Sequence, residues 1–459
     1  MSDHERKRRR RSHRTEAVEE KRPNRSIFFL LILIPILATI AYGGTAEWAM
    51  MLISPLIAIL GCIWLVHSWR RSQFTVSTNT ILHPVIVLLA FAFFQLLPFG
   101  SSGVSGDLLS ISASNALSVD PYSTRIFAAR LAGYVIFFAA ALTFIDSEKR
   151  LRKLVAAIAI FGGAIAFAGI IQWLASPDAI YGVRPTPQAI PFGPYVNRHH
   201  FASLMVLFSG VTLAHIFGAA MKRERKLLMG ISIVLMAVAV VLTGSRGGVL
   251  AYFAIFAVCV IALFQRKENG VKLSVPIGIA AALVLTIGLV VFLGGADPLL
   301  RGFGLQNSTE DISSGRLHFW SVAWQVFTAN PILGAGLDAF GVAYTQFDTR
   351  NGIFRTEQAH NDYLQMLADG GLVGFAIICW FVALVLRKGM SVISRGSNDF
   401  QRVTQVGAFA GAVGILVHSL VDFPLRTTSN AFFFLLVLAM LAADFSSERN
   451  KETIIEPEL

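Results

Sequence analysis

Arginine and histidine side chains that could bind anions and move protons occur where long apolar segments of this chain end. Arg246 lies in the short glycine-rich turn at 243–248, where backbone donors and a planar guanidinium group could bind a phosphate or carboxylate. Arg316 precedes an amphipathic stretch at 317–327, and a cation at a helix start opposes the helix dipole unless an anion binds there. His360 precedes another apolar segment, and an imidazole can act as a general base near neutral pH.

Polar residues beside these three extend the candidate site. Asn361 or Asp362 could cap a helix that follows His360, and a helix N-terminus favours bound anions. Arg198 precedes two adjacent histidines that would point about 100° apart on a helix, which favours contact with an anion or a sugar over a metal site. The secondary candidates are Arg125, Arg130, Asp369, Asp422 and Arg426.

Several of these residues have a competing structural interpretation. Arg246 could be a side chain that snorkels beside a turn, and His360 could be a plain capping residue. Asp422 and Arg426 flank a proline at which a helix should break, and a structural ion pair between them is the alternative there. Asp369 would lie within the apolar layer, where a carboxylate usually lines a polar cavity.

The elements that must position these residues are long apolar segments. The chain has 459 residues, of which 54% are hydrophobic and 15% charged, with a mean hydropathy of +0.62. Because one span needs about 20 apolar residues, we predict an all-α, polytopic membrane protein with about twelve transmembrane helices. The predicted spans are 27–42, 47–66, 82–98, 125–145, 152–174, 199–220, 227–243, 248–265, 273–293, 361–386, 403–421 and 428–444.

The basic residues predict an orientation in the membrane. Basic loops follow the even-numbered spans, so both termini should be cytoplasmic, since Lys and Arg mark that side. Every lysine then falls on the cytoplasmic side: Lys7, Lys21, Lys149, Lys153, Lys222, Lys226, Lys267, Lys272, Lys388 and Lys451. The opposite, periplasmic side has no lysine but keeps a set of arginines: Arg184, Arg198, Arg246, Arg301, Arg316, Arg350, Arg355 and Arg426. Arginines retained on that face are expected to serve binding or chemistry.

The chain is expected to divide into four regions. These are a basic cytoplasmic tail (1–26), N-terminal transmembrane helices (27–150), a membrane domain (151–445) and a second cytoplasmic tail (446–459). The membrane domain includes one large periplasmic loop at 294–359, between the ninth and tenth spans, and so long a loop is uncommon unless it is functional. The basic tail is interpreted as an orientation signal near anionic lipid, so no nucleic-acid partner is expected.

Other kinds of chemistry find no support in the sequence. We identify no cleavable signal peptide, no Walker A motif and no dinucleotide-binding fingerprint, and we expect no cofactor. Cys62, Cys259 and Cys379 each lie in an apolar span without a metal-ligand spacing, so no metal site is expected. The energy for any reaction should then come from an ion gradient or from an activated substrate.

Together the motifs resemble the O-antigen ligase and O-antigen or exopolysaccharide polymerase superfamily of bacterial inner-membrane glycan transferases. The resemblance rests on Gly244–Gly248, Gly315–Arg316 in the large loop, His360–Gly374 and Val421–Pro424. It covers roughly residues 160–445, and the order of the motifs and their shared outer face make the set specific.

The resemblance implies a GT-C-like membrane glycosyltransferase that needs no metal. The donor would be a glycan on undecaprenyl diphosphate, and the acceptor, lipid A-core or a growing polysaccharide, would attack the anomeric carbon through a hydroxyl, with inversion. By position, His360 matches the proposed base of the family, and Arg246 and Arg316 match arginines that engage the diphosphate. Arg198, Asn361 and Asp362 would contact the diphosphate or glycan. Membrane lipids and other polysaccharide export or assembly proteins are the further expected partners.

Three alternatives stay open at the level of sequence. Nothing in the residues names the acceptor, so O-antigen ligase and polysaccharide polymerase are not separated, with the polymerase slightly preferred. A secondary transporter or a flippase for lipid-linked glycans with about twelve spans is the competing class, but transporters tend to have repeated halves and ionisable groups at the midplane. A non-catalytic scaffold for envelope assembly is the third. The arginines and histidines gathered on the outer face argue against the last two classes.

Overall fold

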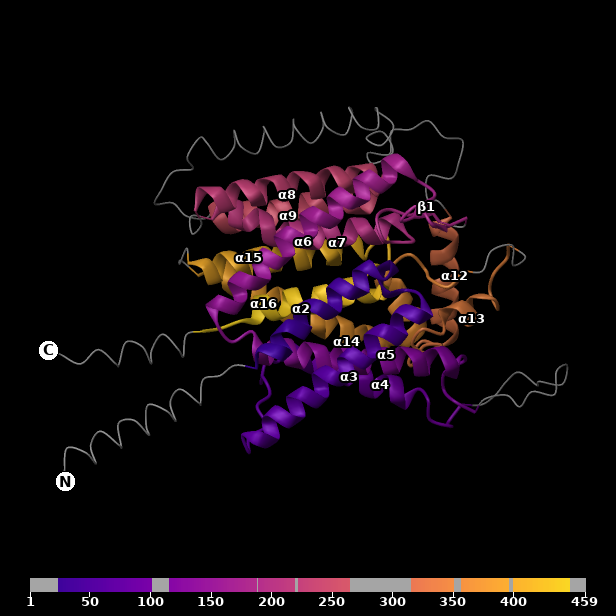
Figure 1. The fold of residues 1–459 in the computed structure, drawn as a ribbon. Coiled ribbons are helices and arrows are strands. Elements are labelled where there is room, and N and C mark those ends of the chain that lie inside the picture. Colours follow the sequence, from indigo (N-terminus) through magenta and orange to yellow (C-terminus); the bar gives the residue numbers. More distant parts are fainter. Residues whose placement is uncertain are drawn as a thin grey trace, which may run out of the picture.

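The computed structural model describes residues 24–100, 115–187, 189–218, 222–264, 315–350, 356–395 and 399–445 (Figure 1). The predicted span at 273–293, the 446–459 tail and most of the 1–26 tail lie outside these residues. The helices have the bounds α2 Arg25–Ile40, α3 Glu47–Arg70, α4 Leu82–Phe94, α5 Pro121–Phe144, α6 Glu148–Ala175, α7 Arg198–Phe217, α8 Arg223–Leu242, α9 Arg246–Phe264, α12 Arg316–Ala329, α13 Phe340–Tyr344, α14 Asp362–Ile393, α15 Phe400–His418 and α16 Thr428–Ala442.

Other regular structure is slight in the described part of the chain. The strands β1 (Ala179–Ile180) and β2 (Arg184–Pro185) pair as an antiparallel hairpin between α6 and α7. Two short 3₁₀ helices, η1 (Tyr42–Gly44) and η2 (Pro424–Arg426), precede α3 and α16. The prediction of an all-α fold is therefore confirmed for these residues, and the predicted amphipathic stretch at 317–327 forms most of α12.

Seven of the described helices are long and apolar enough to cross a membrane, namely α3, α5, α6, α7, α8, α14 and α15. Four shorter apolar helices, α2, α4, α9 and α16, occupy the remaining predicted spans other than 273–293. The protein is thus a multi-pass membrane protein by length and composition of its helices, and the total of about twelve spans stays a prediction.

Asparagine and aspartate side chains fix where several helices begin. Each accepts a hydrogen bond from a backbone N–H of the first helical turn, which would otherwise lack a partner. The capping residues are Asn24 of α2, Asp120 of α5, Asn197 of α7, Asn361 of α14 and Asp399 of α15. Two of these helices, α7 and α14, begin at candidate site residues, so capping sets where those residues stand.

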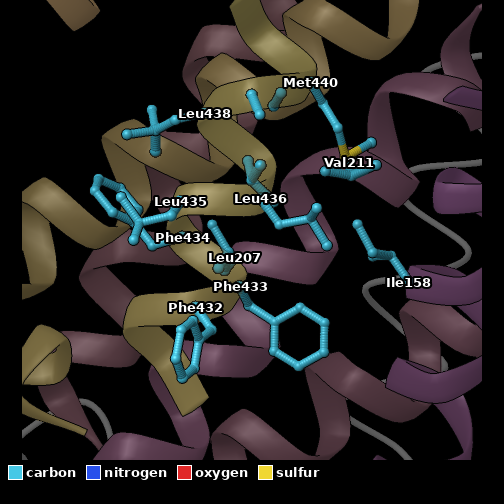
Figure 2. Packing of buried hydrophobic residues seen from close by; sticks show 14 of the residues in the cluster. Ile158, Leu207, Val211, Phe432, Phe433, Phe434, Leu435, Leu436, Leu438 and Met440 are labelled. Carbon is cyan, nitrogen blue, oxygen red and sulfur yellow. The ribbon is translucent and has the colours of Figure 1, made fainter. Parts of the chain in front are cut away.

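The core of the bundle is built around α16. Every residue of this helix is buried, including three consecutive phenylalanines, Phe432, Phe433 and Phe434. Their rings lie among side chains of other helices, such as Leu207 of α7 and Ile158 of α6 (Figure 2). A helix that is apolar on all sides is expected at the centre of a large bundle, and α16 has that position.

Glycines allow α7 and α15 to pack closely. A Cβ atom on Gly210 would overlap the backbone of Gly411, and one on Gly407 would overlap the backbone of α7. Small residues bring helix backbones together in membrane proteins, because packing and not water exclusion drives helix association in lipid. This close pair holds the start of α7 and the end of α15 at the same end of the bundle.

The two ends of the bundle differ in which basic residues they carry. Figure 1 shows α12, α13 and the β1–β2 hairpin at one end of the bundle. The helices α7, α9 and α14 also begin at this end. Arg198, Arg246 and Arg316 are the first residues of α7, α9 and α12. The lysines that the structure describes lie toward the other end of the helices: Lys149, Lys153, Lys222, Lys226 and Lys388.

A break inside α14 receives the loop that follows α12. Gly371 interrupts the helix with φ 59° and ψ −157°, a conformation open essentially to glycine alone. The freed N–H of Leu372 donates to Pro331 O at 2.8 Å, and the loop N–H of Gly336 donates to Asp369 O at 2.9 Å. These bonds hold the loop after α12 against α14. They thereby help to keep Arg316, at the start of α12, and His360, just before α14, at the same end of the bundle.

We predict that Gly371→Ala destabilises the protein by roughly 1–3 kcal/mol, because the new Cβ would overlap Ile332 O and the φ is unfavourable for alanine. The midpoint of thermal unfolding in detergent measures the effect. Gly230→Ala in α8 is the matched control, since its Cβ would meet no atom within 4 Å, and it should keep or slightly raise the midpoint. Equal midpoints for the two variants would contradict the assigned break.

Candidate functional site

Asp422 is the centre of the candidate site. Its side chain is 1% exposed, and one side chain from α7, one from α12 and one from the segment just before α14 approach it. His360 Nδ1 lies 3.4 Å from Oδ1, Arg316 Nη2 lies 3.7 Å from Oδ2, and His200 Nε2 lies 3.9 Å from Oδ1. A carboxylate buried this deeply needs such partners, because an uncompensated buried charge is very costly.

The end of α15 places Asp422. Its backbone N–H donates to His418 O at 3.1 Å and so completes the last helical turn. The chain then turns, with the N–H of Phe423 donating to Asp422 Oδ1 at 2.9 Å. Pro424 opens η2, which agrees with the prediction that the helix breaks at this proline.

His360 stands directly before α14. Its φ of 53° is in the left-handed region, uncommon for a residue other than glycine. The imidazole lies between two aromatic rings, with centroids 5.8 Å from Phe319 and 4.8 Å from Phe423. The side chain is 28% exposed, so part of the ring remains accessible to a substrate while Nδ1 faces Asp422.

Asn361 and Asp362 have separate tasks. The Asn361 side chain caps α14 by accepting from the backbone N–H groups of Tyr363 and Leu364, both at 3.0 Å. Asp362 joins α14 to the end of α15, because its N–H donates to Ser419 O at 3.0 Å and its Oδ2 accepts from Ser419 Oγ at 2.9 Å. Of the two capping candidates, Asn361 is therefore the cap, and Asp362 helps to hold His360 beside Asp422.

Two opposing effects set the charge of Asp422. Burial alone raises the pKa of its carboxyl, but the close approach of His360, with His199 and His200 nearby, lowers that pKa well below its usual value. Asp422 is therefore a carboxylate at neutral pH. An ionised carboxylate beside Nδ1 of His360 fixes the orientation of the imidazole and stabilises the cation that forms when the other nitrogen takes a proton.

The glycine-rich turn before α9 packs against α15. Arg246, the first residue of α9, is exposed. Ser245 Oγ accepts from Gly248 N at 3.2 Å and so caps the helix. Gly247 lies against His418, where a Cβ atom would overlap the imidazole. The turn therefore keeps its glycine for a close contact that holds the start of α9 beside the end of α15.

The structure gathers some of the candidate residues and leaves others apart. Arg198 is half-buried at the start of α7, two residues before His200. Arg125 is exposed and Arg130 half-buried on α5, whereas the contacts with Asp422 described above come from α7, α12 and α14. His318, the third residue of α12, pairs with Asp348 at 2.9 Å.

A part of the chain that contributes residues to this site is similar to a known protein family. Residues 231–379 match the family model described as O-antigen ligase. This segment, which is less than half of the chain, is similar to the O-antigen ligase family. No curated protein matches the chain. The match confirms the resemblance to the O-antigen ligase and polymerase superfamily, and with the apolar helices it indicates a membrane glycosyltransferase that acts on lipid-linked polysaccharide.

The matched segment of the O-antigen ligase family contains only part of the site. Arg246, Arg316 and His360 lie within it, whereas Asp422 and His200 lie outside it. The helices α7 and α15, which lie before and after the matched segment, therefore complete the geometry around His360.

Arg426, in η2 between α15 and α16, binds residues of the segment that matches the O-antigen ligase family. It forms an ion pair with Asp338 through Nη1, and its Nη2 lies 2.8 Å from Asp369 Oδ2, to which Gln365 Nε2 also donates at 3.3 Å. Burial alone lowers the pKa of Arg426, but the two carboxylates raise it, so the guanidinium keeps its charge. Arg426 and Asp422 thus bind other partners, and the ion pair suggested between them by the sequence is not formed in the described structure.

Sequence reasoning missed Asp338, Gln365 and Gln95 of this network. Gln95, at the end of α4, donates through Nε2 to Leu333 O at 2.7 Å and to Asp369 O at 3.1 Å. Its Oε1 accepts from the N–H of Leu337 at 2.9 Å. The amide therefore satisfies three backbone groups of the loop after α12 and the α14 break. A lone amide within the predicted span at 82–98 was its only signal in the sequence.

We predict that Arg426→Met lowers the free energy of unfolding by about 3–5 kcal/mol, because the buried carboxylate of Asp369 and the half-buried one of Asp338 lose their counter-charge. Adding Asp369→Asn to this variant should recover part of the loss. Thermal unfolding in detergent measures both effects. The control is Arg152→Met, whose pair with Glu148 is about 40% exposed on each side and should cost about 1 kcal/mol at most. A similar loss in both arginine variants would contradict the buried network.

Proposed function

We propose that this protein transfers a glycan from undecaprenyl diphosphate to an acceptor hydroxyl at the periplasmic face of the bacterial inner membrane. The reaction would be metal-independent and would invert the anomeric carbon. The observation that carries the proposal is the approach of His360 to Asp422 beside Arg316, at 3.4 Å and 3.7 Å from the same carboxylate. A base and an anion-binding group stand side by side there, as displacement of a diphosphate by a hydroxyl requires.

His360 is the proposed base. With Nδ1 facing Asp422, its Nε2 is left to accept the proton of the acceptor hydroxyl. The acceptor oxygen then bonds to the anomeric carbon from the side opposite the diphosphate. The bond from that carbon to the diphosphate oxygen breaks, and its electron pair stays on the leaving group. Asp422 would stabilise the imidazolium without taking the proton.

The arginines are proposed to bind the diphosphate as its charge increases. Arg316 has a buried Nε that makes no hydrogen bond in the described structure, so it can still donate to an anion. Arg246 is exposed at the start of α9, next to the capped turn, where backbone N–H groups add further donors. Arg198 and the α14 N-terminus at Asn361 are proposed as further contacts for the diphosphate or glycan.

Orientation and acceptor complete the proposal. The end of the bundle with α12 and the candidate site would face the periplasm, and the lysine-bearing end would face the cytoplasm. Both termini are proposed to be cytoplasmic. The domain division at residue 150 would separate N-terminal helices from the membrane domain that holds the site. The acceptor would be either lipid A-core, for a ligase, or a growing polysaccharide, for a polymerase of O-antigen or exopolysaccharide.

We predict that His360→Ala, Arg316→Ala and Arg246→Ala each reduce glycan transfer by about 100-fold or more, since a positioned base or oxyanion donor contributes that much. Surface polysaccharide is measured in a deletion strain that expresses each variant, together with protein level and membrane insertion. His83→Ala is the control, because His83 is an exposed residue of α4, on none of the helices that approach Asp422.

The glycan that accumulates in the strains with inactive variants distinguishes a polymerase from a ligase. Single lipid-linked repeats would indicate a polymerase, and intact but unattached chains would indicate a ligase. Normal surface polymer from both His360→Ala and Arg246→Ala would refute the catalytic proposal and favour a transporter or a scaffold. Loss of function with Arg246→Ala but not with His360→Ala would favour binding without catalysis.

We predict that a cysteine at position 184 reacts with a membrane-impermeant maleimide from the periplasm, whereas one at position 222 does not. Arg184 and Lys222 are both exposed, but they lie toward opposite ends of the bundle. The experiment uses a background without Cys62, Cys259 and Cys379, and permeabilised cells show that both positions can react. Labelling of position 222 alone in intact spheroplasts would invert the proposed orientation.

A further inference from the structure

His200 occupies a position equivalent to that of His360 around Asp422. The two imidazoles approach the same oxygen, Oδ1, at 3.9 Å and 3.4 Å. Both also pack against Phe423, with ring centroids 4.7 Å and 4.8 Å apart and interplanar angles of 75° and 72°. They differ in access, because the His200 side chain is 8% exposed and that of His360 is 28% exposed. Only His360 is open to a substrate, so His200 must act through its neighbours.

The surroundings of His200 fix its ring. Thr427 Oγ1 lies 2.7 Å from Nδ1, and Asn430 Nδ2 donates to the His200 carbonyl oxygen at 3.0 Å. Tyr195 OH in turn donates to Asn430 Oδ1 at 2.8 Å. Thr427 and Asn430 belong to the start of α16, the helix that is buried along its whole length. His200 is thus anchored to the most buried element of the bundle.

The contact with Thr427 bears on which ring nitrogen of His200 carries the proton. If Thr427 donates its hydroxyl proton to Nδ1, the ring proton of neutral His200 sits on Nε2, which faces Asp422. Nε2 is buried and makes no hydrogen bond in the described structure. A phenylalanine would fill this space without a buried polar atom, so packing alone does not account for a histidine here.

We propose that His200 is a positioning residue for the glycan transfer, and that its Nε2–H holds the Asp422 carboxylate in the orientation that His360 requires. The inference rests on the proposed function of His360. The distance of 3.9 Å is longer than a hydrogen bond, and such contacts commonly shorten when substrate binds. His200 and the N–H of Phe423 would together fix Oδ1, leaving the carboxylate no freedom to turn away from His360.

Two substitutions separate orientation from packing. His200→Phe keeps an aromatic ring of similar shape against Phe423 but removes both nitrogens. His200→Gln loses the ring but keeps an N–H donor that can reach Asp422. The purified variants are assayed with the membrane lipid fraction extracted from the deletion strain, which supplies both lipid-linked donor and acceptor. Varying the amount of this extract gives the maximal rate and the half-saturating amount separately.

We expect His200→Phe to lower the maximal rate about tenfold to 100-fold, as loss of a residue that orients a functional group typically does, with the half-saturating amount unchanged. His200→Gln should recover most of the rate. Full activity of His200→Phe, or an equal loss in both variants, would overturn the inference. If His360→Ala is inactive in the same assay the proposed function still stands, whereas an active His360→Ala would remove the proposed function itself.

The chain supplies a matched control at the other end of α7. His215 Nε2 pairs with Thr404 Oγ1 at 2.9 Å, and its ring packs against Phe400 with centroids 4.7 Å apart, so it is a buried His–Thr–Phe group like that of His200. His215→Phe should leave the rate unchanged. If His200→Phe is not obtained as a monodisperse protein, Thr427→Val gives the same test. It should lower the rate, and an unchanged rate would overturn the inference.

Discussion

The docking of the loop after α12 into the break of α14 is the constraint on which the rest of the site depends. Gly371 frees backbone groups of α14, and residues 331–336 bind them with their own backbone. Because Arg316 begins α12 and His360 precedes α14, this backbone pairing brings a cation and an imidazole from distant parts of the chain to one carboxylate. Gln95 and Arg426 bind further polar groups of the same junction, among them the N–H of Leu337 and Oδ2 of Asp369.

The buried charges of this end fall into two groups with different tasks. Around Arg426, guanidinium and carboxylates are matched closely, and such an arrangement holds a loop in place. Around Asp422, the side-chain nitrogens of the partners lie 3.4–3.9 Å away, and three buried nitrogens make no hydrogen bond in the described residues: His200 Nε2, His360 Nδ1 and Arg316 Nε. Incompletely satisfied buried groups are costly unless something binds them, so the second group is suited to a ligand and the first to a scaffold.

The sequence predicted the helices and several residues of the site for clear physical reasons. Long apolar segments and Asn or Asp caps mark the helices. Arg316 begins a helix, where a cation opposes the helix dipole, and His360 just precedes a helix, where an imidazole can act as a base. It did not predict that Asp422 faces His360 while Arg426 faces Asp369, because both pairs join segments far apart in the chain. Gln95 and the break at Gly371 were missed for the same reason, since a polar residue or a glycine in an apolar run has no partner visible in the sequence.

The burial of α16 has a consequence for biosynthesis. This helix is the last apolar segment of the chain, yet its whole surface is covered by helices made before it. Since chains are synthesised from the N-terminus and membrane helices insert before they pack, the earlier helices must leave this central position open until α16 has been made. Thr427 and Asn430, which hold His200, arrive at the same moment. Products that end before α16 would therefore lack the central helix of the core and the residues that hold His200.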